Sequence, residues 1–112
     1  PLDHNAEKAI APVRLIVDEA TTVGPRSIHG RSHWDRVESN GLLIAAESGA
    51  DPIVVALFAL FHDCMRESDG WDPEHGPRAA EFIRRRSEAL HFLSRLQLDQ
   101  LLHACSHHTH EI

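Results

Sequence analysis

The chain has 112 residues, with 17 acidic and 11 basic side chains, a formal net charge of -6 and 42% apolar residues. This length and apolar content are enough for one domain with one core, and the acidic balance argues against a nucleic acid polymer as partner. The two cysteines, Cys64 and Cys105, make no disulfide framework, and no apolar run is long enough for a membrane span or a signal peptide. We therefore expect one soluble, reduced, cytoplasmic domain over residues 1–112, without a membrane partner and with its oligomeric state open.

Helical spacing of apolar residues dominates the chain, whereas the alternation typical of strands does not persist. This predicts an all-α fold, a single compact bundle of about five helices. The first helix is expected over about residues 5–20, before the turn signal of Gly24 and Pro25. The second is expected from Ser27 or His29 to Ser48, followed by Gly49 as a left-handed cap.

Two further helices are expected to begin at Asp-Pro pairs, in which the aspartate caps the helix and proline takes the first helical position. The third starts at Asp51-Pro52 and is apolar on all sides, which is typical of a buried central helix. A polar loop over residues 64–71 leads to the fourth, which is expected to start at Asp72-Pro73. The fifth starts at Ser94, where Ser94 and Gln97 form a capping-box pattern, and runs towards the C-terminus.

Three of the ten histidines fall on predicted apolar faces, where a ligand of a buried site has to lie. Histidines at 103, 107 and 110 fall on a more polar face of the fifth helix. The apolar stripes combine His33 with Val37, Asn40 and Ile44, His75 with Ala79, Phe82 and Ile83, and His108 with Leu98, Leu101 and Cys105.

A further pair, His62 and Asp63, ends the apolar third helix. The two side chains diverge by about 100° but can still meet on one ion at the helix end, where the macrodipole favours a cation. A single histidine on an apolar face is more often hydrogen-bonded core than a ligand. Five unpaired buried groups, however, would each cost about 1 to 3 kcal/mol, out of a typical stability of about 5 to 15 kcal/mol. One or two divalent ions would satisfy them together, and imidazole with carboxylate suits Mn, Fe, Co, Ni or Zn better than Ca.

Four stretches, "HWDRV" (33–37), "ALFHD" (59–63), "DPEHG" (72–76) and "ACSHHT" (104–109), resemble the HD-domain superfamily of metal-dependent phosphohydrolases. The resemblance covers about residues 27–110. It implies a helical fold in which His33, His62 and Asp63 bind a first metal. It also implies that His75 and His108 correspond to the extra histidines of members with two metals.

Members of this superfamily close the site with a further aspartate downstream of the last histidine, and the sequence reaches Ile112 without one. Asp99 is not expected to replace it, because it lies off the stripe of His108. We therefore expect either a C-terminally incomplete domain or impaired metal binding and activity.

The resemblance implies hydrolysis of a nucleotide-like or other small phosphoester, in which the metal activates water for in-line attack. The catalytic candidates are Asp63, Arg66, Asp72 and His29. Arg66 could supply positive charge or form a surface ion pair, Asp72 could be a base or a helix cap, and His29 could reach substrate or a nearby water. Two alternatives stay open, a di-iron oxygenase on the same scaffold and a metal-binding module without turnover.

Overall fold

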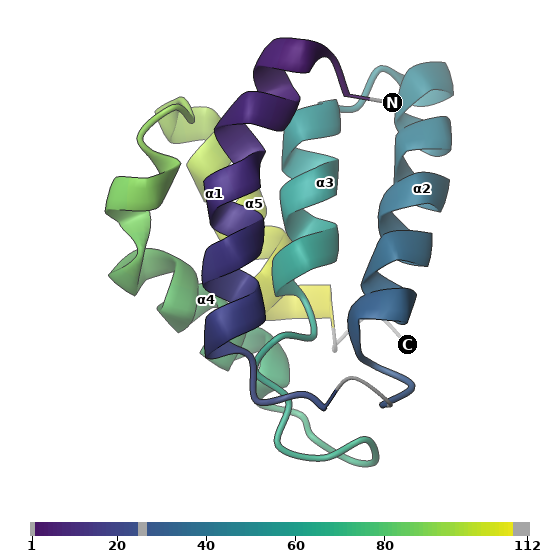
Figure 1. Ribbon diagram of the computed structural model, residues 1–112, viewed down its shortest axis with the longest axis vertical. Helices are drawn as coiled ribbons and strands as arrows, with labels where there is room; N and C mark the ends of the chain where they lie inside the picture. The colour runs from purple at the N-terminus through teal and green to yellow at the C-terminus, as the bar shows by residue number, and fades with distance from the viewer. Residues whose placement is uncertain (1, 25–26, 109–112) are drawn as a thin grey trace.

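Five α-helices and a short 3₁₀ helix form the protein in a computed structural model, which describes residues 2–24 and 27–108 (Figure 1). Within these residues there is no strand, and the prediction of an all-α single bundle is confirmed. In chain order the elements are α1 (His4–Ala20), α2 (Arg31–Ser48), α3 (Pro52–Phe61), α4 (His75–Arg85), η1 (Ser87–Leu90) and α5 (Arg95–His107).

Helix α3 is the centre of the bundle, as its all-round apolar sequence predicts. It contacts α1, α2, α4 and α5, and Figure 1 shows it between α1 and α2. Its side chains Leu57, Leu60 and Phe61 are buried in one core with residues of the other helices. Burial of each leucine or phenylalanine side chain contributes about 1.5 to 3 kcal/mol to stability. The packing of α3 therefore holds its C-terminal end, which is followed by His62 and Asp63, in a fixed position.

Predicted capping signals set three of the helix ends. The Asp51 carboxylate accepts hydrogen bonds from the backbone N–H groups of Ile53 and Val54, with proline in the first turn. Ser94 and Gln97 form the expected capping box at the start of α5. Gly49 ends α2 in the left-handed region, with φ of 79°, where a side chain would be strained.

The fourth helix begins later than predicted, and Asp72 is not its cap. Helix α4 starts at His75, and no side chain caps it. The Asp72 carboxylate instead accepts a hydrogen bond from the backbone N–H of Glu67 and pairs with Arg78. The prediction was wrong because these longer-range partners outcompete the local cap, so Asp72 fastens the loop before α4. The structure also adds η1 and begins α2 at Arg31, after a turn over residues 27–30.

The buried face of α2 differs from the predicted stripe. Trp34 and Ala45 are buried, whereas Asn40 and Ile44 are exposed. Gly41 explains this difference, because a Cβ added there would lie 2.7 Å from Cγ1 of Val55. The glycine lets α3 pack closely against the face of α2 that contains Gly41, and the pattern of apolar residues does not identify this face. His33 lies at the edge of that face, with 30% of its side chain exposed.

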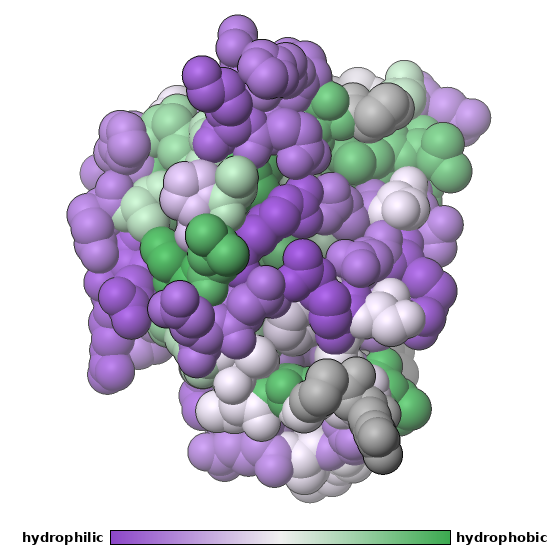
Figure 2. All heavy atoms as spheres, viewed as in Figure 1, coloured by the Kyte–Doolittle hydropathy of each residue, from purple (hydrophilic) through white to green (hydrophobic). Residues whose placement is uncertain are grey.

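The surface is mostly hydrophilic on the face drawn in Figure 2, with apolar side chains gathered over the upper end of α2. Leu43 and Ile44 are among the exposed large apolar residues. None of the helices in the described ranges combines the length and apolarity needed to cross a membrane.

Candidate metal centre

One cavity of about 600 Å³ collects residues that lie at the ends of four helices. His33 lies in the first turn of α2 and His75 is the first residue of α4, while His62 and His108 follow the last residues of α3 and α5. Helix ends are where a side chain can leave the packed core and still be held by it. The lining consists of His29, His33, His62, Asp63, Arg66, Trp71, Asp72, Pro73, His75 and His108.

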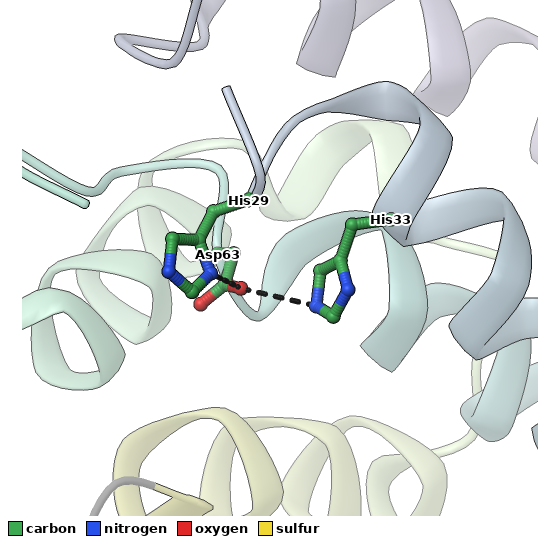
Figure 3. A group of neighbouring side chains, drawn as sticks. All are labelled: His29, His33 and Asp63. Atoms are coloured by element: carbon green, nitrogen blue, oxygen red, sulfur yellow. Dashed lines mark hydrogen bonds and ion pairs between the residues drawn. The ribbon is translucent and has the colours of Figure 1, made fainter. Parts of the chain in front are cut away.

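Asp63 is the centre of this group, and its Oδ2 atom faces three histidines. The Oδ2 atom lies 3.1 Å from Nδ1 of His29, 3.3 Å from Nε2 of His33 and 3.4 Å from Nε2 of His62. Figure 3 shows His29 and His33 pointing at the carboxylate from neighbouring turns. The Nε2 atoms of His33 and His62 are 3.3 Å apart, so these two nitrogens and Oδ2 form a nearly equilateral triangle.

The Oδ1 atom of the same carboxylate faces a second group. It lies 3.1 Å from Nε2 of His75 and 3.8 Å from Nε2 of His108. The two Nε2 atoms are 2.9 Å apart. Arg66 donates from Nε to the same oxygen at 3.0 Å, so the buried carboxylate already has one permanent cationic partner.

The histidine rings are oriented by backbone carbonyl groups. The Nδ1 atoms of His62, His75 and His108 lie 3.0, 2.5 and 2.8 Å from the carbonyl oxygens of Ala59, Asp72 and Cys105, respectively. His29 turns its Nε2 atom to the carbonyl of Asp69 at 3.2 Å. Because a carbonyl only accepts, the Nδ1 atoms of neutral His62, His75 and His108 carry the hydrogen, and their Nε2 atoms present lone pairs towards Asp63. This arrangement is the one that metal-ligating histidines adopt. His29 differs, since one of its ring nitrogens faces the Asp69 carbonyl and the other the Asp63 carboxylate, and both are acceptors.

The spacing of these atoms fits a bound ion. Ligand atoms bonded at about 2.0 to 2.1 Å to a tetrahedral ion lie about 3.3 to 3.4 Å from one another. Besides the triangle of His33, His62 and Asp63, two groups could hold an ion, namely His29 with His33 and Asp63, and Asp63 with His75 and His108. The donor set of imidazole and carboxylate suits a divalent transition metal. The cluster therefore could bind metal, with Asp63 common to every group.

Burial sets the protonation states of the cluster. Burial lowers the pKa of His62 to about 4 and lowers the pKa values of His33 and His75 below the ordinary value. Burial alone would raise the pKa of Asp63, but the charge of Arg66, which also donates to Oδ1 at 3.0 Å, and the charge that His62 carries at low pH outweigh burial and lower that pKa. Near pH 7 the lowered pKa values of His33, His62 and His75 favour neutral imidazoles beside an ionised Asp63 carboxylate, which is the form that binds a cation.

The predicted residues His33, His62, Asp63, His75 and His108 all line this cavity, whereas His107 is exposed on α5. His110 lies outside the described residues. Of the catalytic candidates, Arg66 forms its ion pair inside the cavity rather than on the surface, and Asp72 lines the cavity while bound to Arg78. Asp99, expected to lie away from the site, is exposed and pairs with Arg95.

Sequence reasoning missed two features of the site. It predicted that His29 could reach substrate or a nearby water, but not that His29 contacts Asp63 directly, which it does because the turn over residues 27–30 folds it back over the carboxylate. It gave no role to Trp71, which lines the cavity from the loop before α4. The only available signal was a large aromatic residue in an otherwise polar loop.

Helices α4 and α5 cross closely beside the site, at Gly76. A Cβ added to Gly76 would lie 2.4 Å from the backbone oxygen of Cys105 and 3.3 Å from Cε1 of His108. This glycine therefore sets the distance between the two helices that supply His75 and His108.

Two cysteines of the core lie close in sequence to residues of the cluster, Cys64 next to Asp63 and Cys105 three residues before His108. Cys64 and Cys105 are free and fully buried, with 0% exposure. Burial raises the pKa of Cys64 to about 12, so in the metal-free protein this thiol is protonated near neutral pH. Both behave as small apolar residues of the core.

Comparison of the chain with protein-family models, with curated proteins and with solved structures found no match. The resemblance to the HD-domain superfamily therefore stays a prediction.

Proposed function

We propose that this protein is a metal-dependent phosphohydrolase of the HD-domain type, acting on a small phosphoester. The observation that supports this proposal most strongly is the arrangement around Asp63. Ring nitrogens from five histidines surround one buried carboxylate, and in His29, His62, His75 and His108 the other ring nitrogen faces a backbone carbonyl. Such a set of lone pairs is costly to bury unless a cation lies among them.

The residues divide into groups that would hold metal and groups that would hold substrate. His33, His62 and Asp63 would bind a first ion, and His75 and His108 would bind a second ion with Asp63 shared between them. When bound, a divalent cation polarises a phosphoryl oxygen and lowers the pKa of water. A shared carboxylate with ligands on both of its oxygens is consistent with a site for two ions.

Two further side chains would act on the substrate. Arg66 lines the cavity and carries a permanent positive charge, which would attract the anionic phosphoester. His29 is partly exposed and keeps its Nδ1 atom beside Asp63, so it could accept or return a proton at the cavity wall. Asp72 is less suited to act as a base, because Arg78 binds both of its oxygens, at 2.8 and 2.7 Å.

The proposal is tested by counting metal and measuring phosphate release in parallel. The protein is purified without an affinity tag, its metal content is determined by plasma mass spectrometry, and a panel of phosphoesters is assayed with Mn, Fe, Co, Ni and Zn. Asp63→Asn should lose both bound metal and turnover. Asp99→Asn is the matched control, because Asp99 is an exposed carboxylate on α5 and should change neither.

The alternatives give different results in the same experiment. Stoichiometric metal without release of phosphate from any ester would support a metal-binding module without turnover. Bound iron with a mixed-valent spectrum would support a di-iron oxygenase. Absence of bound metal in the unmodified chain, together with unchanged stability of Asp63→Asn, would refute the metal site itself.

A further inference from the structure

Trp71 is the most exposed large apolar side chain of the described residues, and it stands at the metal cavity. Its exposure is 86%, whereas the other tryptophan, Trp34, is 2% exposed and belongs to the core. Trp71 and Pro73 form an apolar part of the cavity lining, whereas the rest of the lining consists of imidazole, carboxylate and guanidinium side chains. A tryptophan that contributes nothing to the core yet borders a cavity offers its apolar ring to whatever enters there.

The backbone on both sides of Trp71 is fastened. Arg66 donates from Nη1 to the carbonyl oxygens of Ser68, at 3.2 Å, and Gly70, at 3.3 Å. On the other side, Arg78 binds the Asp72 carboxylate and also donates from Nε to the carbonyl of Met65 at 3.0 Å. The loop is therefore held at the residues before and after Trp71, so the backbone that carries the tryptophan is fixed in advance of ligand binding.

Cavity size argues for a ligand larger than phosphate. The volume of about 600 Å³ lies in the range of small-molecule sites. A phosphate group at Arg66 and Asp63 would fill only the polar end. The remaining space borders Trp71 and Pro73, where a flat apolar group is better accommodated than a charged one.

We propose that Trp71 is a specificity-determining residue that stacks on a planar ring in the alcohol portion of the phosphoester. The inference rests on the proposed function for the phosphate end of the site, but the stacking itself requires no metal, because Trp71 is not a ligand. The preferred substrates are then phosphoesters that carry a planar heterocycle, and esters of sugars or aliphatic alcohols bind less tightly. Stacking of one base on an aromatic side chain corresponds to about 5- to 150-fold in Kd.

The test compares adenosine 5′-monophosphate with ribose 5-phosphate, which has the same sugar and phosphate but lacks the planar adenine base. Calorimetric titration of the metal-loaded protein should show that Trp71→Ala weakens binding of the nucleotide by about 5- to 150-fold and leaves ribose 5-phosphate unchanged. Trp71→Phe keeps an aromatic face and should retain most of the affinity. Leu96→Ala is the matched control, because Leu96 is also a large exposed apolar residue and lies outside the cavity.

Tryptophan fluorescence separates this inference from the hydrolase proposal. Adenosine should quench the emission of the metal-free protein, and the quench should be lost in Trp71→Phe, since Trp34 is buried. If quenching occurs but no phosphoester is hydrolysed, the stacking site stands and the hydrolase proposal fails. Equal weakening of both ligands by Trp71→Ala, or quenching that persists in Trp71→Phe, would overturn the inference even if hydrolysis is found.

Discussion

The Nε2 atoms of His75 and His108 lie 2.9 Å apart, and the Nδ1 atom of each ring already faces a backbone carbonyl. Two lone pairs at that distance repel each other unless a proton or a cation lies between them. Metal should therefore stabilise the fold. At a free metal concentration 100-fold above Kd, the gain is about 2.7 kcal/mol, which raises Tm by roughly 10 °C or more for a domain of this size. Scanning calorimetry with Mn, Fe, Co, Ni or Zn, reversed by a chelator, measures it, and an unchanged Tm with all five metals would refute it.

Removal of one cluster histidine should weaken metal binding more than removal of a surface histidine on the same helix. His108→Ala is expected to reduce metal affinity by more than about tenfold, because it removes a donor at the cavity. His103→Ala is the control, since His103 is exposed on α5 and stacks on His107. Calorimetric metal titration of both variants decides the matter. A larger loss in His103→Ala would mean that the exposed pair, and not the cavity, holds the metal.

The metal-free protein should lose stability as the pH falls from about 6.5 to about 4. Burial lowers the pKa of His62 from 6.5 to about 4, so the unfolded chain binds more protons than the folded one within this window, and stability rises with pH across it. His62 alone corresponds to about 3 kcal/mol, fully present above pH 6.5. Urea unfolding at pH 7 and pH 4.5 measures the difference. His62→Gln should flatten the pH dependence, and an equal slope in both proteins would contradict the assignment.

Gly76→Ala should destabilise the bundle and also weaken metal binding. The added methyl group would lie 2.4 Å from the backbone oxygen of Cys105, so α4 and α5 have to separate, at a typical cost of about 1 to 3 kcal/mol. Because His75 precedes Gly76 and His108 follows α5, the separation also pulls the two ligands apart. Gly24→Ala is the control, with nothing within 4 Å of an added Cβ. Equal unfolding midpoints for the two variants would show that the crossing tolerates a side chain.

The parts of the fold that the sequence predicted are those governed by short-range signals. Asp51 and Ser94 cap helices within three residues of their own positions, and Gly49 adopts the left-handed conformation that its neighbours require. Asp72 carries the same local signal as Asp51 but bonds to Arg78, six residues away, so the local rule failed there. A cap signal cannot anticipate a competing partner that only the tertiary fold supplies.

The site residues, too, could be predicted where the sequence has a local pattern and could not be predicted where their position depends on tertiary contacts. His108 could be placed because α5 has a clear apolar stripe that ends in it, and the structure puts it at the cavity. The predicted buried stripe of α2 that contains His33 also included Asn40 and Ile44, and both are exposed. The prediction was wrong there because the close approach of α3 at Gly41 puts a different face of α2 against the core. Trp71 gave no periodic signal at all, since it lies in a loop whose position depends on the two arginines that fasten it.

Cys64 directly follows Asp63, and Cys105 lies one turn before His108, with both thiols fully buried. A thiol reagent reaches either sulfur only when the bundle opens around the carboxylate or at the end of α5. The rate of modification therefore measures how often the bundle opens around these two core residues. Modification of both cysteines should therefore be slower whenever a bound ion, or a ring stacked on Trp71, holds the helix ends together.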